Sequence, residues 1–73
     1  MEREIRIKTP FIKLDALLKF ADVVSSGGEA KLLIQDGLVF YNGEACTMRG
    51  KKCVPGDAIV VKGIKIAVRE ADA

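Results

Sequence analysis

The spacing of hydrophobic residues predicts an amphipathic strand at the start of the chain and a short helix after it. Ile5 and Ile7 alternate with charged residues over 2–8, which is the period of a strand with one buried face. Over 14–21 apolar residues recur every three or four positions, as on one face of a helix. The predicted core residues of this part are Leu14, Leu17, Leu18 and Ala21, together with Phe11 and Phe20.

A second helix is predicted to begin at Gly27 or Gly28, with Ser26 as its capping residue. A serine there accepts a hydrogen bond from one of the first N–H groups, which lack a partner within the helix. Lys31 points away from the predicted core, and Gly37 ends the helix in the left-handed conformation. The predicted core face consists of Ala30, Leu33 and Ile34.

The second half of the chain predicts strands joined by tight turns. Asn42-Gly43 is a preferred pair for a two-residue hairpin turn, between strands at 38–41 and 44–47. Lys62-Gly63 joins two runs rich in β-branched residues and predicts a second hairpin. We therefore expect a single α+β domain over 1–73, in which two short helices pack on one face of a small antiparallel β-sheet.

The composition agrees with one small globular domain. A chain of 73 residues, with 49% hydrophobic and 30% charged residues, can hold one core and is neither a tail nor a fibre. No apolar run approaches the roughly 20 residues of a membrane span. The first residues lack the apolar core of a signal peptide. These observations predict a cytoplasmic protein without a membrane partner.

The residues that catalysis or metal binding would need are scarce. The sequence has no histidine, and a zinc site needs four ligands, so Cys46 and Cys53 are expected to be reduced and free of metal. No serine or cysteine lies in a nucleophile motif, and no carboxylates pair in an apolar setting. We expect no enzyme activity, no cofactor and no small-molecule substrate. A protein–protein interaction adaptor associated with the ribosome or nucleic-acid machinery remains the alternative to a binder of nucleic acid.

Two short segments could bind anions, although the net charge is only +2. Arg49, Lys51 and Lys52 lie in an interval, 45–56, that contains no acidic residue. Gly27 and Gly28 would leave the N–H groups at a helix start open to an approaching phosphate. Each segment also has a simpler interpretation. The basic residues could form a solvated loop, the glycines could only permit a sharp turn, and Glu29 could satisfy the helix dipole.

The order and spacing of several motifs resemble the S-four-type RNA-binding domain, or alpha-L RNA-binding motif, named after a small-subunit ribosomal protein. The resemblance covers about 13–61 and rests on Lys13-Leu14-Asp15, Ser26 to Ala30, Gly37 to Gly43, and Gly56-Asp57. Gly27 stands where the family usually has an arginine. With Gly-Gly-x-Ala-Lys and Arg-Gly-Lys-Lys, the chain is similar to short stand-alone bacterial members of the family.

This resemblance implies a structured RNA as the partner, such as ribosomal or transfer RNA, with a ribosomal subunit as a further possibility. It also implies that the basic loop lies beside the second helix, so that the RNA phosphates are bound from both sides. The implied RNA-binding residues are Lys13, Ser26, Gly27, Gly28, Lys31, Arg49, Lys51 and Lys52.

Overall fold

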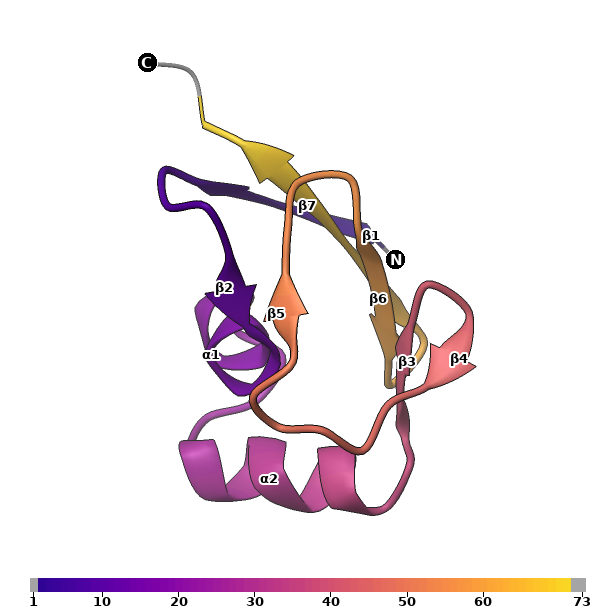
Figure 1. The fold of residues 1–73 in the computed structure, drawn as a ribbon. Coiled ribbons are helices and arrows are strands. Elements are labelled where there is room, and N and C mark those ends of the chain that lie inside the picture. Colours follow the sequence, from indigo (N-terminus) through magenta and orange to yellow (C-terminus); the bar gives the residue numbers. More distant parts are fainter. Residues whose placement is uncertain (1, 72–73) are drawn as a thin grey trace.

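The structure is a computed structural model, and it describes residues 2–71. Over these residues the helices are α1 (Leu14–Phe20) and α2 (Gly27–Gln35). The strands are β1 (Glu2–Ile7), β2 (Ile12–Lys13), β3 (Val39–Tyr41), β4 (Glu44–Ala45), β5 (Lys52–Cys53), β6 (Ala58–Val61) and β7 (Ile64–Glu70) (Figure 1). The predicted α+β class is confirmed. None of the helices in this part of the chain is long and apolar enough to cross a membrane.

The strands of the described residues form a five-stranded sheet in the order β1-β7-β6-β3-β4 and a small ladder of β2 with β5. The prediction of a purely antiparallel sheet is wrong at one edge, because β1 runs parallel to β7. The other pairs of the large sheet are antiparallel. A hydrophobic pattern shows that a segment is a strand, but it carries no information on a partner almost the whole chain away.

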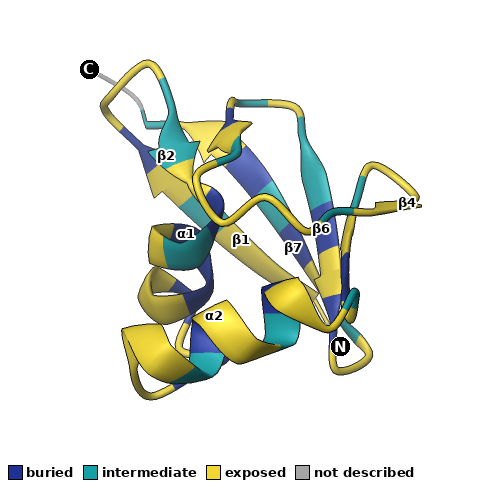
Figure 2. Cartoon of the chain, turned by 60° about the horizontal axis from the view of Figure 1, so that its bottom comes forward, coloured by how far each residue is buried: buried dark blue, intermediate teal, exposed yellow. Residues whose placement is uncertain are grey.

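The core lies between the helices and one face of the large sheet, as the dark-blue segments in Figure 2 show. The predicted core face of α1 is confirmed, since Leu14, Leu17 and Leu18 are fully buried. On α2, Ala30 and Ile34 are fully buried but Leu33 is only half-buried. The opposite face of the sheet has no covering layer within residues 2–71, and Phe40 and Val60 are exposed there.

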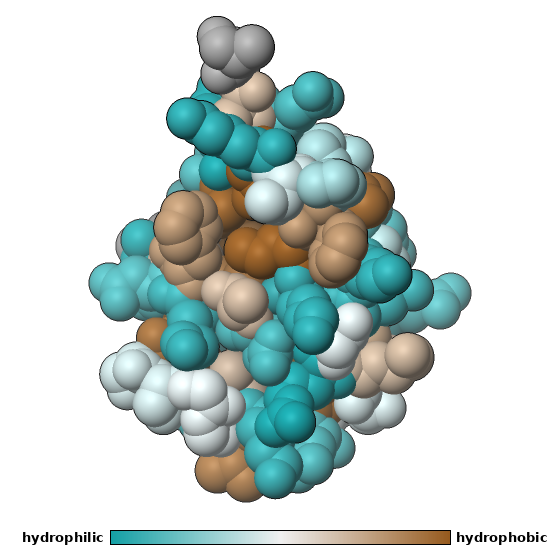
Figure 3. All heavy atoms as spheres, turned by 60° about the vertical axis from the view of Figure 1, so that its left-hand side comes forward, coloured by the Kyte–Doolittle hydropathy of each residue, from teal (hydrophilic) through white to brown (hydrophobic). Residues whose placement is uncertain are grey.

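The prediction that Phe11 and Phe20 are core residues is wrong. Phe20 is 65% exposed, and Phe11 is half-buried. Phe20 follows the buried Leu18 by two positions, which is about 200° around a helix, so the two side chains point in different directions. With Ile7 and Ile12, Phe20 lines an apolar hollow. Figure 3 shows an apolar patch on this side of the molecule, which carries β2 and α1.

Both predicted hairpin turns are confirmed by their backbone angles. Asn42 and Gly43 have φ values of 50° and 91°, and Lys62 and Gly63 have values of 53° and 74°. Positive φ at both central residues is the geometry of a turn whose twist matches that of the flanking strands. The second hairpin turn therefore places Lys62 at its tip.

Candidate nucleic-acid interface

The basic loop, defined as residues 49–52, is held against the start of α1. The N–H of Leu14 donates to the Lys51 carbonyl at 2.9 Å, and the N–H of Asp15 donates to the Arg49 carbonyl at 3.2 Å. These carbonyls satisfy N–H groups that a helix start leaves without partners. The loop is therefore fixed by its backbone, and the side chains of Arg49 and Lys52 remain exposed.

Two lysines lie opposite each other in the β2–β5 ladder. Lys13 and Lys52 are paired in register, and both are exposed. Like charges directly opposite on neighbouring strands are destabilising. Within residues 2–71 neither lysine forms an ion pair with a carboxylate. An anion bound between them would relieve this repulsion.

The other contacts of the loop position its cations. The Nε of Arg49 lies 3.8 Å from Oδ2 of Asp15, so the two side chains form an ion pair at the start of α1. The Nζ of Lys51 lies 4.9 Å from the centroid of the Tyr41 ring. The Nζ of Lys52 lies 4.9 Å from that of Phe11. Both separations are within the range of cation–π attraction.

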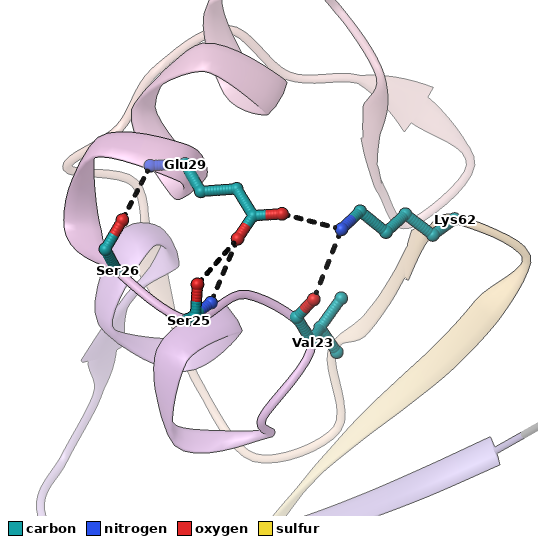
Figure 4. A network of polar contacts seen from close by, with 5 residues as sticks. All are labelled: Val23, Ser25, Ser26, Glu29 and Lys62. Atoms are coloured by element: carbon teal, nitrogen blue, oxygen red, sulfur yellow. Dashed lines mark hydrogen bonds and ion pairs between the residues drawn. The ribbon is translucent and has the colours of Figure 1, made fainter.

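The start of α2 is capped as predicted. The Ser26 Oγ accepts from the N–H of Glu29 at 3.2 Å. The Glu29 carboxylate accepts from the N–H of Ser25 at 3.0 Å and from Nζ of Lys62 at 2.9 Å, and the same Nζ lies 3.4 Å from the Val23 carbonyl (Figure 4). The hydrogen bond from Lys62 is the main cause that lowers the pKa of Glu29 to about 2.

Lys62 was not identified from the sequence, because it lies 33 positions from Glu29. Its ammonium group offsets the negative charge that Glu29 brings to the start of α2. Because Lys62 offsets its charge, Glu29 repels an anion at the start of α2 less strongly than an unpaired carboxylate would.

Neither glycine at the start of α2 is required by the fold. Positive φ values occur at other glycines but not at Gly27 or Gly28. A Cβ at Gly27 would meet no atom within 4 Å, and one at Gly28 would meet only Ser26 Oγ at 3.8 Å. The interpretation that these glycines permit a sharp turn is thus not supported. Their N–H groups belong to the first helical turn, where the helix itself supplies no acceptor.

The structure places the predicted residues in two groups. One group surrounds the basic loop and the β2–β5 ladder and consists of Lys13, Arg49, Lys51 and Lys52. The other lies on the first turns of α2 and consists of Ser26, Gly27, Gly28 and Lys31. The chain from β4 to β5 runs alongside α2 in Figures 1 and 2. No hydrogen bond or ion pair between described residues joins the two groups.

A polar network explains why the Asn-Gly and Gly-Asp motifs occur together. The Oη of Tyr41 donates to Oδ2 of Asp57, and Nδ2 of Asn42 donates to Oδ1 of Asp57 at 3.1 Å. The N–H of Val54 donates to the same carboxylate at 2.9 Å. Asp57 thus connects the first hairpin to the chain that leaves the basic loop. These motif residues have a structural role that sequence reasoning did not assign to them.

The pKa of Tyr41 provides a test of this network. The hydrogen bond to Asp57 is the main cause that raises the pKa of Tyr41 to about 12. Tyr41 is the one tyrosine of the chain and there is no tryptophan, so the near-ultraviolet absorbance band of tyrosinate follows its ionisation alone. We expect the midpoint of the Tyr41 titration to lie near pH 12 in the folded protein. The Asp57→Asn variant should move it toward the ordinary value of about 10. A wild-type midpoint near the ordinary value, with circular dichroism still showing a folded chain, would contradict the network.

The two cysteines flank the basic loop. The Sγ of Cys46 lies 3.8 Å from the Met48 carbonyl, and the Sγ of Cys53 lies 3.7 Å from the Lys51 carbonyl. Both thiols are free, and burial raises the pKa of Cys53 to about 12. A protonated thiol is a poor nucleophile and a poor metal ligand. In residues 2–71 no three metal-binding side chains gather at one place.

The fold and the basic surface define the class of this protein. The sequence model of the S4 domain matches residues 5–69, and the chain belongs to the S4 domain family, which is a family of RNA-binding domains. The chain is also similar to a Bacillus subtilis (strain 168) protein named "Probable ribosome maturation protein RlbA". The two are 40% identical over 63 residues, which cover 86% of this chain and 89% of the relative.

Proposed function

We propose that this protein binds structured RNA, such as ribosomal or transfer RNA, by holding its phosphates between the basic loop and the start of α2. The observation that carries the proposal is the pairing of Lys13 with Lys52 on adjacent strands, without an acidic partner among residues 2–71. Lysine contacts to phosphate position a protein on RNA, and the shape of the RNA decides which molecule is bound.

The start of α2 would supply the second phosphate site. The N–H groups of Gly27 and Gly28 are unhindered by any side chain of their own, and the exposed Lys31 lies within the next turn. A helix N-terminus with free N–H groups attracts phosphate. In this chain Lys31 would take the place of the arginine that the family usually has at the position of Gly27.

The similarity to a probable ribosome maturation protein supports ribosomal RNA as the partner. A ribosomal subunit would then be the assembly that presents the phosphates, and the cytoplasm would be the place of action. On this proposal the protein acts by binding and carries out no catalysis, which agrees with the RNA-binding family to which it belongs.

Substitution of the two glycines tests the α2 site. The Gly27→Ala and Gly28→Ala variants should keep or raise the melting temperature, because alanine is more favourable than glycine in a helix by about 1 kcal/mol. We expect both variants to bind RNA several-fold more weakly, since the added methyl groups obstruct the N–H groups. Fluorescence anisotropy with a structured ribosomal RNA fragment measures the affinity. Co-sedimentation with ribosomal subunits at low and high salt then tests whether each variant also binds the assembled subunit.

Two further variants complete the comparison. Gln35→Ala changes an exposed residue at the other end of α2 and should leave affinity unchanged. Lys31→Ala keeps the glycine N–H groups and removes only the nearby cation. Wild-type affinity in both glycine variants and in Lys31→Ala would show that RNA does not contact this helix.

A further inference from the structure

A pocket beside the basic loop is not used by the proposed phosphate contacts. It lies between the β3–β4 hairpin and the chain that follows, and its volume is about 240 Å³. Its lining includes Tyr41, Glu44, Thr47, Met48 and Lys51. The pocket therefore combines an aromatic ring, a thioether, a hydroxyl group and charges of both signs. A void that only reflects loose core packing would be lined by apolar groups.

The apolar part of the pocket suits a flat ring. The Met48 side chain is 63% exposed and lines the pocket. A thioether is polarisable and adapts to the face of an aromatic group. Tyr41 also lines the pocket, and the ammonium group of Lys51 lies 4.9 Å from the centroid of its ring. Proteins hold unpaired RNA bases against such side chains while neighbouring cations hold the backbone.

The polar part of the pocket suits the edge of a base. Glu44 is exposed, and no lysine or arginine among residues 2–71 forms an ion pair with it. An ionised carboxylate only accepts hydrogen bonds, whereas the Thr47 hydroxyl both donates and accepts. A carboxylate would repel a phosphate, but it accepts from an amino group such as N4 of cytosine. The same carboxylate would be repelled by the carbonyl oxygen that uracil carries at this position, because both groups only accept hydrogen bonds.

We propose that this pocket receives one unpaired base that carries an exocyclic amino group. The base would belong to the RNA strand whose phosphates the basic loop binds, so this inference rests on the proposed function. Lys51 connects the two sites, because it belongs to the basic loop and also lines the pocket. The pocket adds a preference among bases to a surface that otherwise recognises charge and shape.

The test compares two RNA hairpins that share one stem and carry a single-stranded loop of either cytidines or uridines. The wild-type protein should bind the cytidine hairpin roughly tenfold more tightly, as one specific base contact provides. Glu44→Gln should remove most of this preference, because an amide can also donate to uracil. The slope of log affinity against log salt should stay unchanged in Glu44→Gln, since no phosphate contact is lost.

A direct signal comes from Met48. The chain has two methionines, so Met48→Leu assigns the methyl resonance of Met48 in protein labelled at its methionine methyl groups. We expect the cytidine hairpin to shift this resonance by the ring current of the bound base. Val60→Ala removes an exposed apolar side chain from the outer face of the sheet and should change neither affinity nor the resonance.

The possible failures of the two proposals can be distinguished. Equal affinity for both hairpins, an unshifted Met48 resonance and binding that still depends steeply on salt would overturn the pocket and leave the phosphate surface intact. Failure of a folded wild-type protein to bind either hairpin at low salt would overturn both proposals.

Discussion

Neutralising the basic loop is expected to weaken RNA binding strongly while the chain stays folded. The variant combines Arg49→Gln, Lys51→Gln and Lys52→Gln. If the wild-type protein neutralises about three to five phosphates, the slope of log affinity against log salt should be roughly −2 to −4. Each lost contact should reduce the slope by roughly 0.7 to 0.9. Exposed substitutions usually change stability by about 0.5 kcal/mol or less. Replacing half-buried Lys51 should cost about 0.5–1 kcal/mol more in stability, because its contact with the Tyr41 ring is lost.

The control variant loses the same charge elsewhere. Lys8, Lys19 and Lys65 are exposed and lie outside the basic loop, and their replacement by glutamine removes three positive charges. Binding that fell equally in both triple variants would show that only net charge matters. Unchanged affinity in the loop variant, measured by fluorescence anisotropy beside a melting curve, would show that the RNA-binding surface lies on another face.

Among the variants proposed for this protein, Ile34→Ala is expected to lose the most stability. Ile34 is fully buried on the core face of α2. Removing such a side chain costs roughly 2 to 5 kcal/mol, from the lost burial and the cavity left behind. This is a large part of the roughly 5–15 kcal/mol that stabilises a typical domain. The midpoint of urea unfolding should therefore be much lower than that of the wild-type protein. RNA binding should be lost only under conditions in which the chain is unfolded.

Leu32→Ala provides a matched control on the same helix. Leu32 is 62% exposed, so its truncation removes a similar side chain with little loss of buried area. We expect a change of about 0.5 kcal/mol or less. Equal midpoints for the Ile34→Ala and Leu32→Ala proteins would mean that α2 does not pack as the structure shows.

Local signals in the sequence were sufficient for the parts of the fold that depend on a few neighbouring residues. Ser26 was predicted as the cap because its hydrogen bond spans three positions, and Asn42-Gly43 was predicted as a turn because its backbone geometry restricts residue type. The helical angle of Phe20 places it off the apolar face of α1, which is why the prediction of a core position is wrong.

Features that join distant segments could not be predicted. The Lys62–Glu29 ion pair and the contact of Lys51 with Tyr41 each depend on how the strands are arranged in space. The Lys13–Lys52 pairing depends on a two-stranded ladder too short to give a periodic pattern. The charges and motifs in the sequence predict where an anion could bind, whereas the repulsion between Lys13 and Lys52 follows only from the pairing of their strands.

The position of β7 has a consequence for synthesis of the protein. Although β7 follows every other strand along the chain, it lies inside the sheet, between β6 and β1. During translation β1 therefore emerges first and has no partner until residues 64–70 have been added. An unpaired strand that persists for so long invites aggregation. The four charged residues of β1, Glu2, Arg3, Glu4 and Arg6, outnumber Ile5 and Ile7 and would keep the nascent strand dissolved until β7 arrives.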